Sequence, residues 1–281
     1  MNEHISWRRQ IVSQLLLLMA GLFVALPIIW MVTIAFDGSI RNRPRGFSLW
    51  PSVWTWNNLA RAWRAPRTGI SFLQVLSNSL TVAGGTALVA MVVGTTAAYA
   101  FARYRFPGRT LGLWASLLLI TVPPAGLIAP FFLIFNGLGI RRSLLSLVIV
   151  YSAIAVPFAV WTVRNAVQAV PLELEEAARL EGAGAVTVFR RITLPLIVPA
   201  IAVAGFIGFA LAWSEFALGW IFISDASRVT LAMTLQSMYE QSGTAWGLLS
   251  ATTILVALPI VIIFYGLGHY LVAGLSLGMG E

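Results

Sequence analysis

Residues 171–199 read PLELEEAARLEGAGAVTVFRRITLPLIVP, and this stretch decides how the chain is organised. It carries both signs of charge, and it lies between two long apolar runs. Its first half combines acidic residues with alanines, and Gly182 and Gly184 follow where a helix is expected to end. The stretch therefore predicts a short amphipathic helical hairpin, residues 171–194, that stands outside the apolar segments and offers its tip to a partner.

The first half of the hairpin has a strong helix-start signal. Pro171 suits the first turn of a helix, because the N–H that proline lacks would be unpaired there anyway. Three acidic residues follow in that turn, where the helix dipole favours negative charge. They are Glu173, Glu175 and Glu176.

The second half of the hairpin predicts another short helix, at about 186–192. It ends in two arginines, which suit the negative end of a helix dipole. Ala177 and Ala178 in the first helix add helix propensity without bulk, so that helix can enter a groove on another protein. Pro195 then opens the next apolar segment.

The composition is that of a membrane protein. Of 281 residues, 59% are hydrophobic and 10% charged, and the mean hydropathy is +0.86. A soluble domain carries about 25% charged residues. We therefore expect an all-α integral membrane fold surrounded by a lipid bilayer. The absence of cysteine excludes disulfides and thiolate metal sites.

All 18 basic residues are arginines, and the net charge is +8. A P-loop uses a lysine on the nucleotide phosphates, so a chain without lysine cannot carry an ordinary P-loop ATPase site. If ATP drives this protein, another chain binds the ATP. The arginines lie singly or in pairs at the ends of apolar runs, where they anchor helices at the bilayer interface, so no nucleic-acid partner is expected.

Six segments contain the roughly 20 apolar residues that a membrane-spanning helix needs. The first is too long for a signal-peptide core and is expected to stay in the chain. The whole chain, 1–281, is predicted to form a single transmembrane domain. The predicted spans are about 11–36, 77–102, 111–136, 143–168, 195–223 and 246–272.

The third predicted span contains the pair Pro123 and Pro124 near its centre. In lipid, a broken helix is tolerated only where protein or a water-filled cavity satisfies the freed carbonyls. Two interpretations stay open: an ordinary kink in a packed bundle, or a cavity wall on the substrate pathway. Four further prolines lie in other predicted spans: Pro27, Pro157, Pro199 and Pro259.

The hairpin also carries a family motif, formed by Glu176, Ala177 and Ala178, then Gly182, then the sequence from Ile192 to Pro195. It resembles, with no insertion, the EAA signature of the permeases of binding-protein-dependent ABC importers. In that family the motif forms a cytoplasmic coupling helix that docks in a cleft of the ATPase subunit. The resemblance implies that Glu176, Ala177, Ala178 and Gly182 couple this chain to an ATPase.

Residues 10–275 as a whole are similar to the sugar-importer branch of this family, in particular to the shorter maltose-type permease subunit. Ser214 departs from that pattern, as does Glu181, where relatives often have Asp. The tail 274–281 lacks the usual ending. The similar stretches are Asn78-Ser79, AYAFAR at 98–103, FPGR at 106–109, PFAVW at 157–161, AWSEF at 212–216 and YLVAGL at 270–275.

The resemblance implies a set of partners and a location. We expect a second permease subunit in a heterodimer, two ATPase subunits that hold the ATP and Mg, and an extracytoplasmic substrate-binding protein. The chain itself would hold no cofactor. It would lie in the bacterial cytoplasmic (inner) membrane as a multi-pass protein with both termini cytoplasmic. Arginine counts alone leave that orientation open, because they divide equally between the two sides.

Trp213, Ser214 and Glu215 are candidates for the substrate pathway, together with Pro123 and Pro124. By the predicted bounds Glu215 lies inside the fifth span, where a carboxylate usually faces a cavity or a partner. Tryptophan beside polar groups suits a sugar, whose ring face stacks on aromatics. Alternatively, the span ends earlier, and Glu215 lies at the membrane interface.

The loop from Ser224 to Thr244 is polar and includes Tyr239, Glu240 and Gln241. In similar permeases this loop reaches into the docked binding protein, and the alternative is a plain surface connection. The sequence shows no Ser–His–Asp set and no paired carboxylates at catalytic spacing, so neither a catalytic nor a metal site is expected.

These features together predict the permease subunit of an ATP-dependent carbohydrate importer. The chain would form half of the translocation pathway and would not be an enzyme. Two alternatives are a secondary carrier driven by an ion gradient and an importer of glycerol-phosphate-type solutes. A carrier needs ionisable groups in the membrane, and Glu215 is the one clear candidate.

Overall fold

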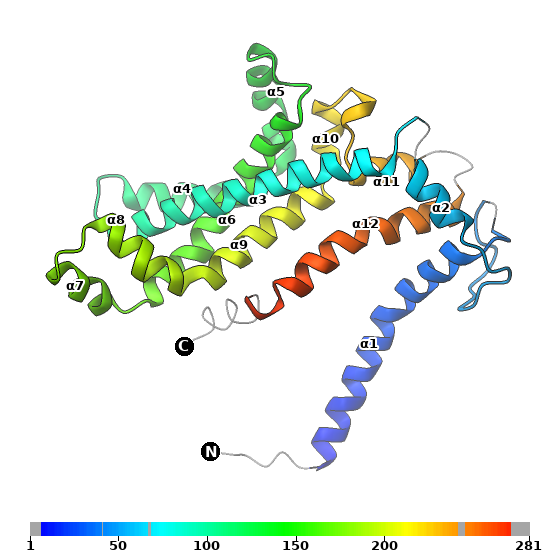
Figure 1. Cartoon of the computed structure of the whole chain (residues 1–281), viewed down its shortest axis with the longest axis horizontal. Helices are drawn as coiled ribbons and strands as arrows, with labels where there is room; N and C mark the ends of the chain where they lie inside the picture. The colour runs from blue at the N-terminus through cyan, green and yellow to red at the C-terminus, as the bar shows by residue number, and fades with distance from the viewer. Residues whose placement is uncertain (1–6, 41, 67–68, 241–244, 271–281) are drawn as a thin grey trace. The chain divides into compact units, whose positions relative to one another are not determined.

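The computed structural model confirms an all-α protein (Figure 1). Within the described ranges the regular elements are helices, apart from an isolated antiparallel bridge between Asp37 and Trp54. The structure describes residues 7–40, 42–66, 69–240 and 245–270. The chain divides into two compact units, which are residues 1–72 with 237–256, and residues 73–236 with 257–281.

Five described helices are long and apolar enough to cross a membrane, and a bent helix pair supplies a sixth span if it crosses as one broken segment. The five are α1 (Trp7–Phe36), α3 (Phe72–Arg103), α6 (Leu144–Ala169), the continuous helix Ala185–Ser214 that contains α8 and α9, and α12 (Trp246–Gly266). The pair is α4 (Arg109–Thr121) and α5 (Ile128–Gly137).

The bend between α4 and α5 is 108°, so the two prolines mark a break rather than an ordinary kink. Val122 and Pro123 both adopt extended backbone, with ψ of 122° and 131°. A proline disfavours the helical region for the residue before it. Consecutive prolines therefore remove two residues from the helix, and a short 3₁₀ turn from Pro124 restarts the chain into α5.

The fifth predicted span runs as one helix only as far as Ser214, where α9 (Leu194–Ser214) ends. Glu215 has extended backbone, and a separate short helix, α10 (Ala217–Phe222), follows. The residues after Glu215 are still apolar, so hydropathy alone joins the two helices into one span.

Small residues bring α3, α6 and α9 together in the larger unit. A Cβ added to Gly94 on α3 would lie 2.6 Å from the Cβ of Ala159 on α6, so the two backbones nearly touch. Such close packing is typical of membrane helices, where small residues let the backbones approach. The buried alanines of this core are Ala90, Ala98, Ala155, Ala159, Ala166, Ala200 and Ala204.

The smaller unit has its own core, formed by Ala35, Ala62 and Ala251. Ala62 lies on α2 (Asn57–Arg64), a helix within the polar connection after α1. The Asp37 carboxylate organises that connection by accepting hydrogen bonds from the backbone N–H groups of Ser39 and Ser52, each at 2.8 Å. Burial raises the Asp37 pKa, but hydrogen bonds from the Ser39 hydroxyl and from the backbone N–H groups of Ser52 and Ser39 outweigh it and hold the pKa below its usual value.

Candidate functional site

The hairpin begins with α7 (Leu172–Leu180), which ends in a Schellman motif. Gly182 has a φ of +87°, in the left-handed region that favours glycine. Its N–H donates to the carbonyl of Arg179, and the N–H of Ala183 donates to that of Ala178, both at 3.0 Å. The prediction that a glycine closes this helix is confirmed at Gly182.

The second half of the hairpin differs from the prediction in two ways. Gly184 has extended backbone, with φ of −69°, and precedes α8 (Ala185–Val188) instead of closing α7. The separate helix predicted at 186–192 is wrong, because α8 continues into α9 through a π-helical turn, Phe189–Thr193. Pro195 accounts for that turn, since its ring and missing N–H disrupt regular pairing with the preceding turn.

One buried carboxylate fastens the hairpin to the rest of the larger unit. The Glu175 side chain is 0% exposed. Its Oε1 accepts hydrogen bonds from Arg103 Nε and Thr193 Oγ1, each at 2.8 Å. Its Oε2 lies 3.4 Å from Arg179 Nη2 and 3.5 Å from the Tyr99 hydroxyl. We call Glu175 and these four partners the clamp.

The clamp joins helices that are far apart in the sequence. Tyr99 and Arg103 lie on the last turns of α3, Glu175 lies on α7, and Thr193 lies in the π-helical turn. Arg103 also donates from Nη2 to the carbonyl of Val170, just beyond α6, at 2.8 Å. A buried carboxylate is tolerated when it is paired and hydrogen-bonded, and Arg103 meets both needs.

The tip of the hairpin presents an acidic and an apolar group to the surroundings. Glu176 is exposed, and its carboxylate has no ion pair with any residue that the structure describes. Leu180 is 91% exposed, and Val186 is 69% exposed. Ala177 is also exposed, so the outward side of α7 is smooth enough to approach another surface closely.

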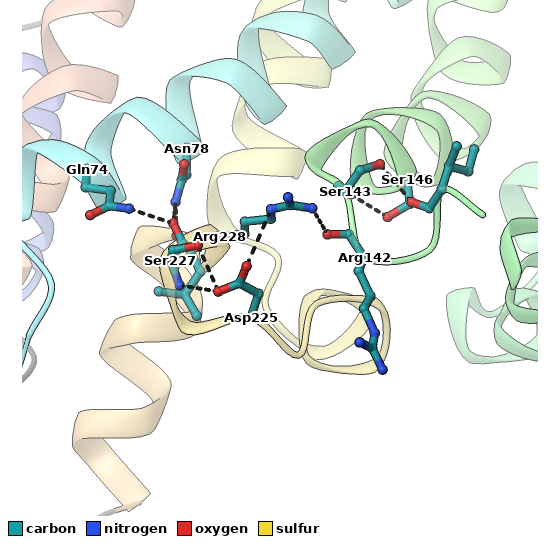
Figure 2. Close-up of polar contacts among 10 residues, drawn as sticks. Gln74, Asn78, Arg142, Ser143, Ser146, Asp225, Ser227 and Arg228 are labelled. Carbon is teal, nitrogen blue, oxygen red and sulfur yellow. Dashed lines mark hydrogen bonds and ion pairs between the residues drawn. The ribbon is translucent and has the colours of Figure 1, made fainter.

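A second polar cluster lies at the opposite end of the larger unit (Figure 1), in residues 223–231, which we call the strap. Figure 2 shows its polar contacts. Asn78 on α3 donates from Nδ2 to the carbonyls of Ser227 and Val229, at 2.8 and 2.9 Å. Gln74 donates to the Ser227 carbonyl at 3.1 Å. The strap is therefore tied to the first turns of α3.

The strap is also tied to the turn between α5 and α6. Arg228 pairs with Asp225, with Nε and Oδ2 3.7 Å apart, and donates to the carbonyl of Arg142 (Figure 2). The backbone N–H and hydroxyl of Ser227 hold the pKa of Asp225 below its usual value, and Arg228 adds to the effect. Asp225 therefore remains charged at neutral pH.

Residues 90–277 match the family described as the binding-protein-dependent transport system inner membrane component. The chain belongs to this family. It is thus the non-catalytic permease component of an ABC transporter and a multi-pass membrane protein, as the hairpin motif predicted.

Curated relatives cover almost all of the permease. The diacetylchitobiose uptake system permease protein DasC of Streptomyces coelicolor is 32% identical over 262 residues, which are 92% of each chain. The trehalose transport system permease protein SugB of Mycobacterium tuberculosis is 28% identical over 261 residues, covering 91% of this chain and 92% of the relative.

A solved structure shares the fold. It is a bacterial ABC transporter involved in the import of the acidic polysaccharide alginate, and the likeness has a TM-score of 0.78. The match covers 96% of the permease and 100% of that chain at 19% identity.

Glu215 is engaged within the permease as a helix cap. Its Oε1 accepts from the N–H groups of Ala217 and Leu218, at 2.8 and 3.1 Å, and so caps the start of α10. Its Oε2 accepts from the Tyr151 hydroxyl at 2.6 Å. These contacts account for the end of α9 at Ser214.

The other predicted pathway residues lie in different surroundings. Trp213 is 4% exposed, and its ring stacks on Phe209 with centroids 5.2 Å apart. Ser214 is exposed, and its hydroxyl donates to the carbonyl of Ala210 in its own helix. Pro123 and Pro124 are exposed in the α4–α5 break. A role for these residues in the substrate pathway stays a prediction.

Two of the three predicted docking-loop residues are described. Tyr239 and Glu240 are exposed at the end of α11 (Leu231–Glu240). Gln241 lies outside the described residues. In the described part of the chain, no cluster of His, Cys, Asp and Glu could hold a metal.

Sequence reasoning missed the structural role of Glu175 and assigned it only to the helix dipole. Two signals were available. Glu175 and Arg179 stand four residues apart, as ion pairs on a helix do. Arg103 also ends a long apolar run and needs an acidic partner if it is buried.

Proposed function

We propose that this permease is one of two membrane subunits of a bacterial carbohydrate importer, with the second subunit a different chain. Two ATPase subunits would bind ATP and Mg, and an extracytoplasmic binding protein would deliver the solute. The diacetylchitobiose and trehalose systems of the relatives support a carbohydrate as the solute class. The lack of lysine supports an external source of ATP hydrolysis.

The hairpin carries the proposal. Its base is fixed by the clamp, whereas its tip exposes Glu176, Leu180 and Val186. A fixed base with a free acidic and apolar tip suits a lever that a partner pushes. Leu180 lies on α7, outside the membrane-spanning helices, and an exposed apolar side chain there is typical of a protein interaction site. Glu176 would form a charged contact with the ATPase, and Leu180 would enter its cleft.

The proposal also assigns an orientation. Because the ATPase subunits work in the cytoplasm, the hairpin would be cytoplasmic and the strap extracytoplasmic. Six membrane crossings, with α4 and α5 as one broken span, would then leave both termini in the cytoplasm. Closure of the ATPase dimer would move the hairpin and open the pathway alternately to each side.

The proposal is tested in the complex reconstituted in liposomes with its second permease, ATPase and binding protein. Glu176→Ala should lower the solute moved per ATP hydrolysed while the complex stays assembled. The matched control is Glu173→Ala, because Glu173 is also exposed in α7. Equal transport by both variants would show that the hairpin tip does not couple the two activities.

The same liposomes test the solute class. We expect uptake of a labelled disaccharide when the binding protein and ATP are both present. Uptake of glycerol phosphate in place of sugars would overturn the carbohydrate assignment. Solute uptake by the permease alone, driven by an ion gradient, would overturn the ABC mechanism.

A further inference from the structure

Polar side chains tie both ends of α3 to segments that lie at opposite ends of the larger unit (Figure 1). We propose that α3 transmits docking of the substrate-binding protein at the strap to the coupling hairpin, with Asn78 and Arg103 as positioning residues. This inference rests on the proposed function and adds to it the element that links the two partner-binding sides.

The contacts at the strap end are buried and directional. Asn78 is 9% exposed, and its amide donates to two strap carbonyls. The next residue, Ser79, is 3% exposed, and its hydroxyl accepts from the N–H of Leu231 at 2.7 Å. Three backbone groups within five residues of the strap, the carbonyls of Ser227 and Val229 and the N–H of Leu231, cannot all be re-paired if the strap moves alone. The first turns of α3 must therefore follow the strap.

The strap leaves charged groups accessible while it holds α3. The Asp225 and Arg228 side chains are 47% and 46% exposed. A protein docking here meets both signs of charge on a segment that is fixed to α3 on one side and to the Arg142 carbonyl on the other. Charge complementarity is typical of transient protein contacts. A shift of the strap on docking therefore reaches α3 directly.

The clamp fixes the other end of α3. Arg103 ends the helix, and its guanidinium holds both Glu175 on α7 and the carbonyl of Val170. Tyr99, one turn earlier, packs its ring against Phe189 with centroids 4.7 Å apart. A displacement of the end of α3 therefore acts on the hairpin at α7 and at the π-helical turn.

The helix between the two ends is continuous. α3 contains 32 residues without a proline, so it is about 48 Å long at 1.5 Å per residue. Its close contact with α6 at Gly94 resists bending toward that helix. A helix of this length reaches across the bilayer core, which is about 30 Å thick. It can therefore carry a displacement from one membrane surface to the other.

The experiment measures ATP hydrolysis by the full reconstituted complex as the concentration of solute-loaded binding protein is raised. Asn78→Asp keeps the size of the side chain but points an acceptor at the two strap carbonyls. We expect stimulation by the binding protein to fall at least about 5-fold, the lower end of typical allosteric coupling. The basal ATPase rate should equal that of the wild type.

Two further variants grade the effect. Ser77→Ala is the matched control, because the Ser77 hydroxyl is exposed and donates to the Gln74 carbonyl of its own helix. It should leave stimulation unchanged. Gln74→Ala removes an exposed contact with the Ser227 carbonyl and should lower stimulation less than Asn78→Asp does. If the Asn78→Asp complex fails to assemble, the test rests on Gln74→Ala: lower stimulation of ATP hydrolysis supports the inference, and unchanged stimulation overturns it.

The kinetic constants of stimulated ATP hydrolysis separate a loss of signal through α3 from a loss of docking or of folding. If α3 transmits the signal, the variants should lower the maximal stimulated rate and leave the KM for the binding protein unchanged. Arg103→Gln should lower the same maximal rate, and the double variant should lose less than the sum of the two free-energy effects. A change confined to KM, or full stimulation of both single variants, would overturn the inference. A wild-type complex that shows no stimulation would instead contradict the proposed function.

Discussion

At the scale of single residues, two adjacent acids in α7 have opposite surroundings. Glu175 is buried against Arg103 and Thr193, whereas Glu176 is exposed. Successive side chains on a helix point about 100° apart, because the helix has 3.6 residues per turn. One acid can therefore fasten the helix to the bundle while its neighbour faces a partner.

Replacing the buried acid should destabilise the permease. Glu175→Leu leaves the Arg103 guanidinium, which is 10% exposed, without its carboxylate. Removing one partner of a buried ion pair typically costs about 3–5 kcal/mol. We expect a clear drop in the melting temperature of the purified protein in detergent. Melting at the wild-type temperature would show that the Arg103 charge is compensated by water or lipid.

The control for that change is Glu173→Leu, which introduces the same residue at an exposed position two residues earlier. It should leave the melting temperature unchanged, because no described residue pairs with Glu173. An equal loss in both variants would assign the effect to the added leucine.

The sequence predicted the hairpin and its closing glycine, but it did not predict which acid is buried. Gly182 could be predicted because a left-handed residue must follow the helix, and glycine meets that local demand. The burial of Glu175 depends on how α7 is rotated against α3, and that is set by partners more than 70 positions away, at Tyr99 and Arg103. A local pattern carries no information about this rotation.

At the scale of whole elements, the same kind of limit applies to helix breaks. Pro27, Pro157, Pro199 and Pro259 all lie inside continuous helices. The pair at 123–124 breaks its helix, because two consecutive residues are forced into extended backbone. The number of adjacent prolines, rather than their presence, predicts the break.

The packing of α3 against α6 gives a test at this scale. Gly94→Leu would place a side chain where a Cβ alone lies 2.6 Å from the Ala159 Cβ. The helices must separate, and overpacking of this kind typically costs about 1–3 kcal/mol. We expect a lower melting temperature and, because the close contact with α6 is lost, weaker stimulation by the binding protein.

Gly84→Ala is the matched change on the same helix. A Cβ at Gly84 has no atom within 4 Å, and alanine favours a helix over glycine by about 1 kcal/mol. This variant should be at least as stable as the wild type. A loss of stability at Gly84 as large as that at Gly94 would show that α3 needs its glycines for bending rather than for close packing.

At the scale of the molecule, the larger unit has a different polar structure at each end. The clamp at one end buries its carboxylate completely, whereas the strap at the other keeps its ion pair about half exposed. A buried network fixes geometry, and an exposed one contributes little stability but can exchange partners. This difference suits a hairpin that transmits force and a strap that meets a transient partner.

The apolar tip of the hairpin gives the last test, on assembly of the whole complex. Leu180→Asp places a charge on a side chain that is 91% exposed, so the fold of the permease should be unaffected. In the proposed ATPase cleft the same carboxylate would lose its water, and a buried hot-spot residue is typically worth about 2 kcal/mol or more. We therefore expect binding of the ATPase to permease complexes in nanodiscs to weaken about 30-fold, since 1.4 kcal/mol corresponds to a factor of ten.

Leu138→Asp, at an exposed leucine that follows α5, is the control and should bind the ATPase as the wild type does. Equal binding by all three proteins would mean that the ATPase docks elsewhere on the permease, and the clamp would then stabilise a surface loop rather than a lever.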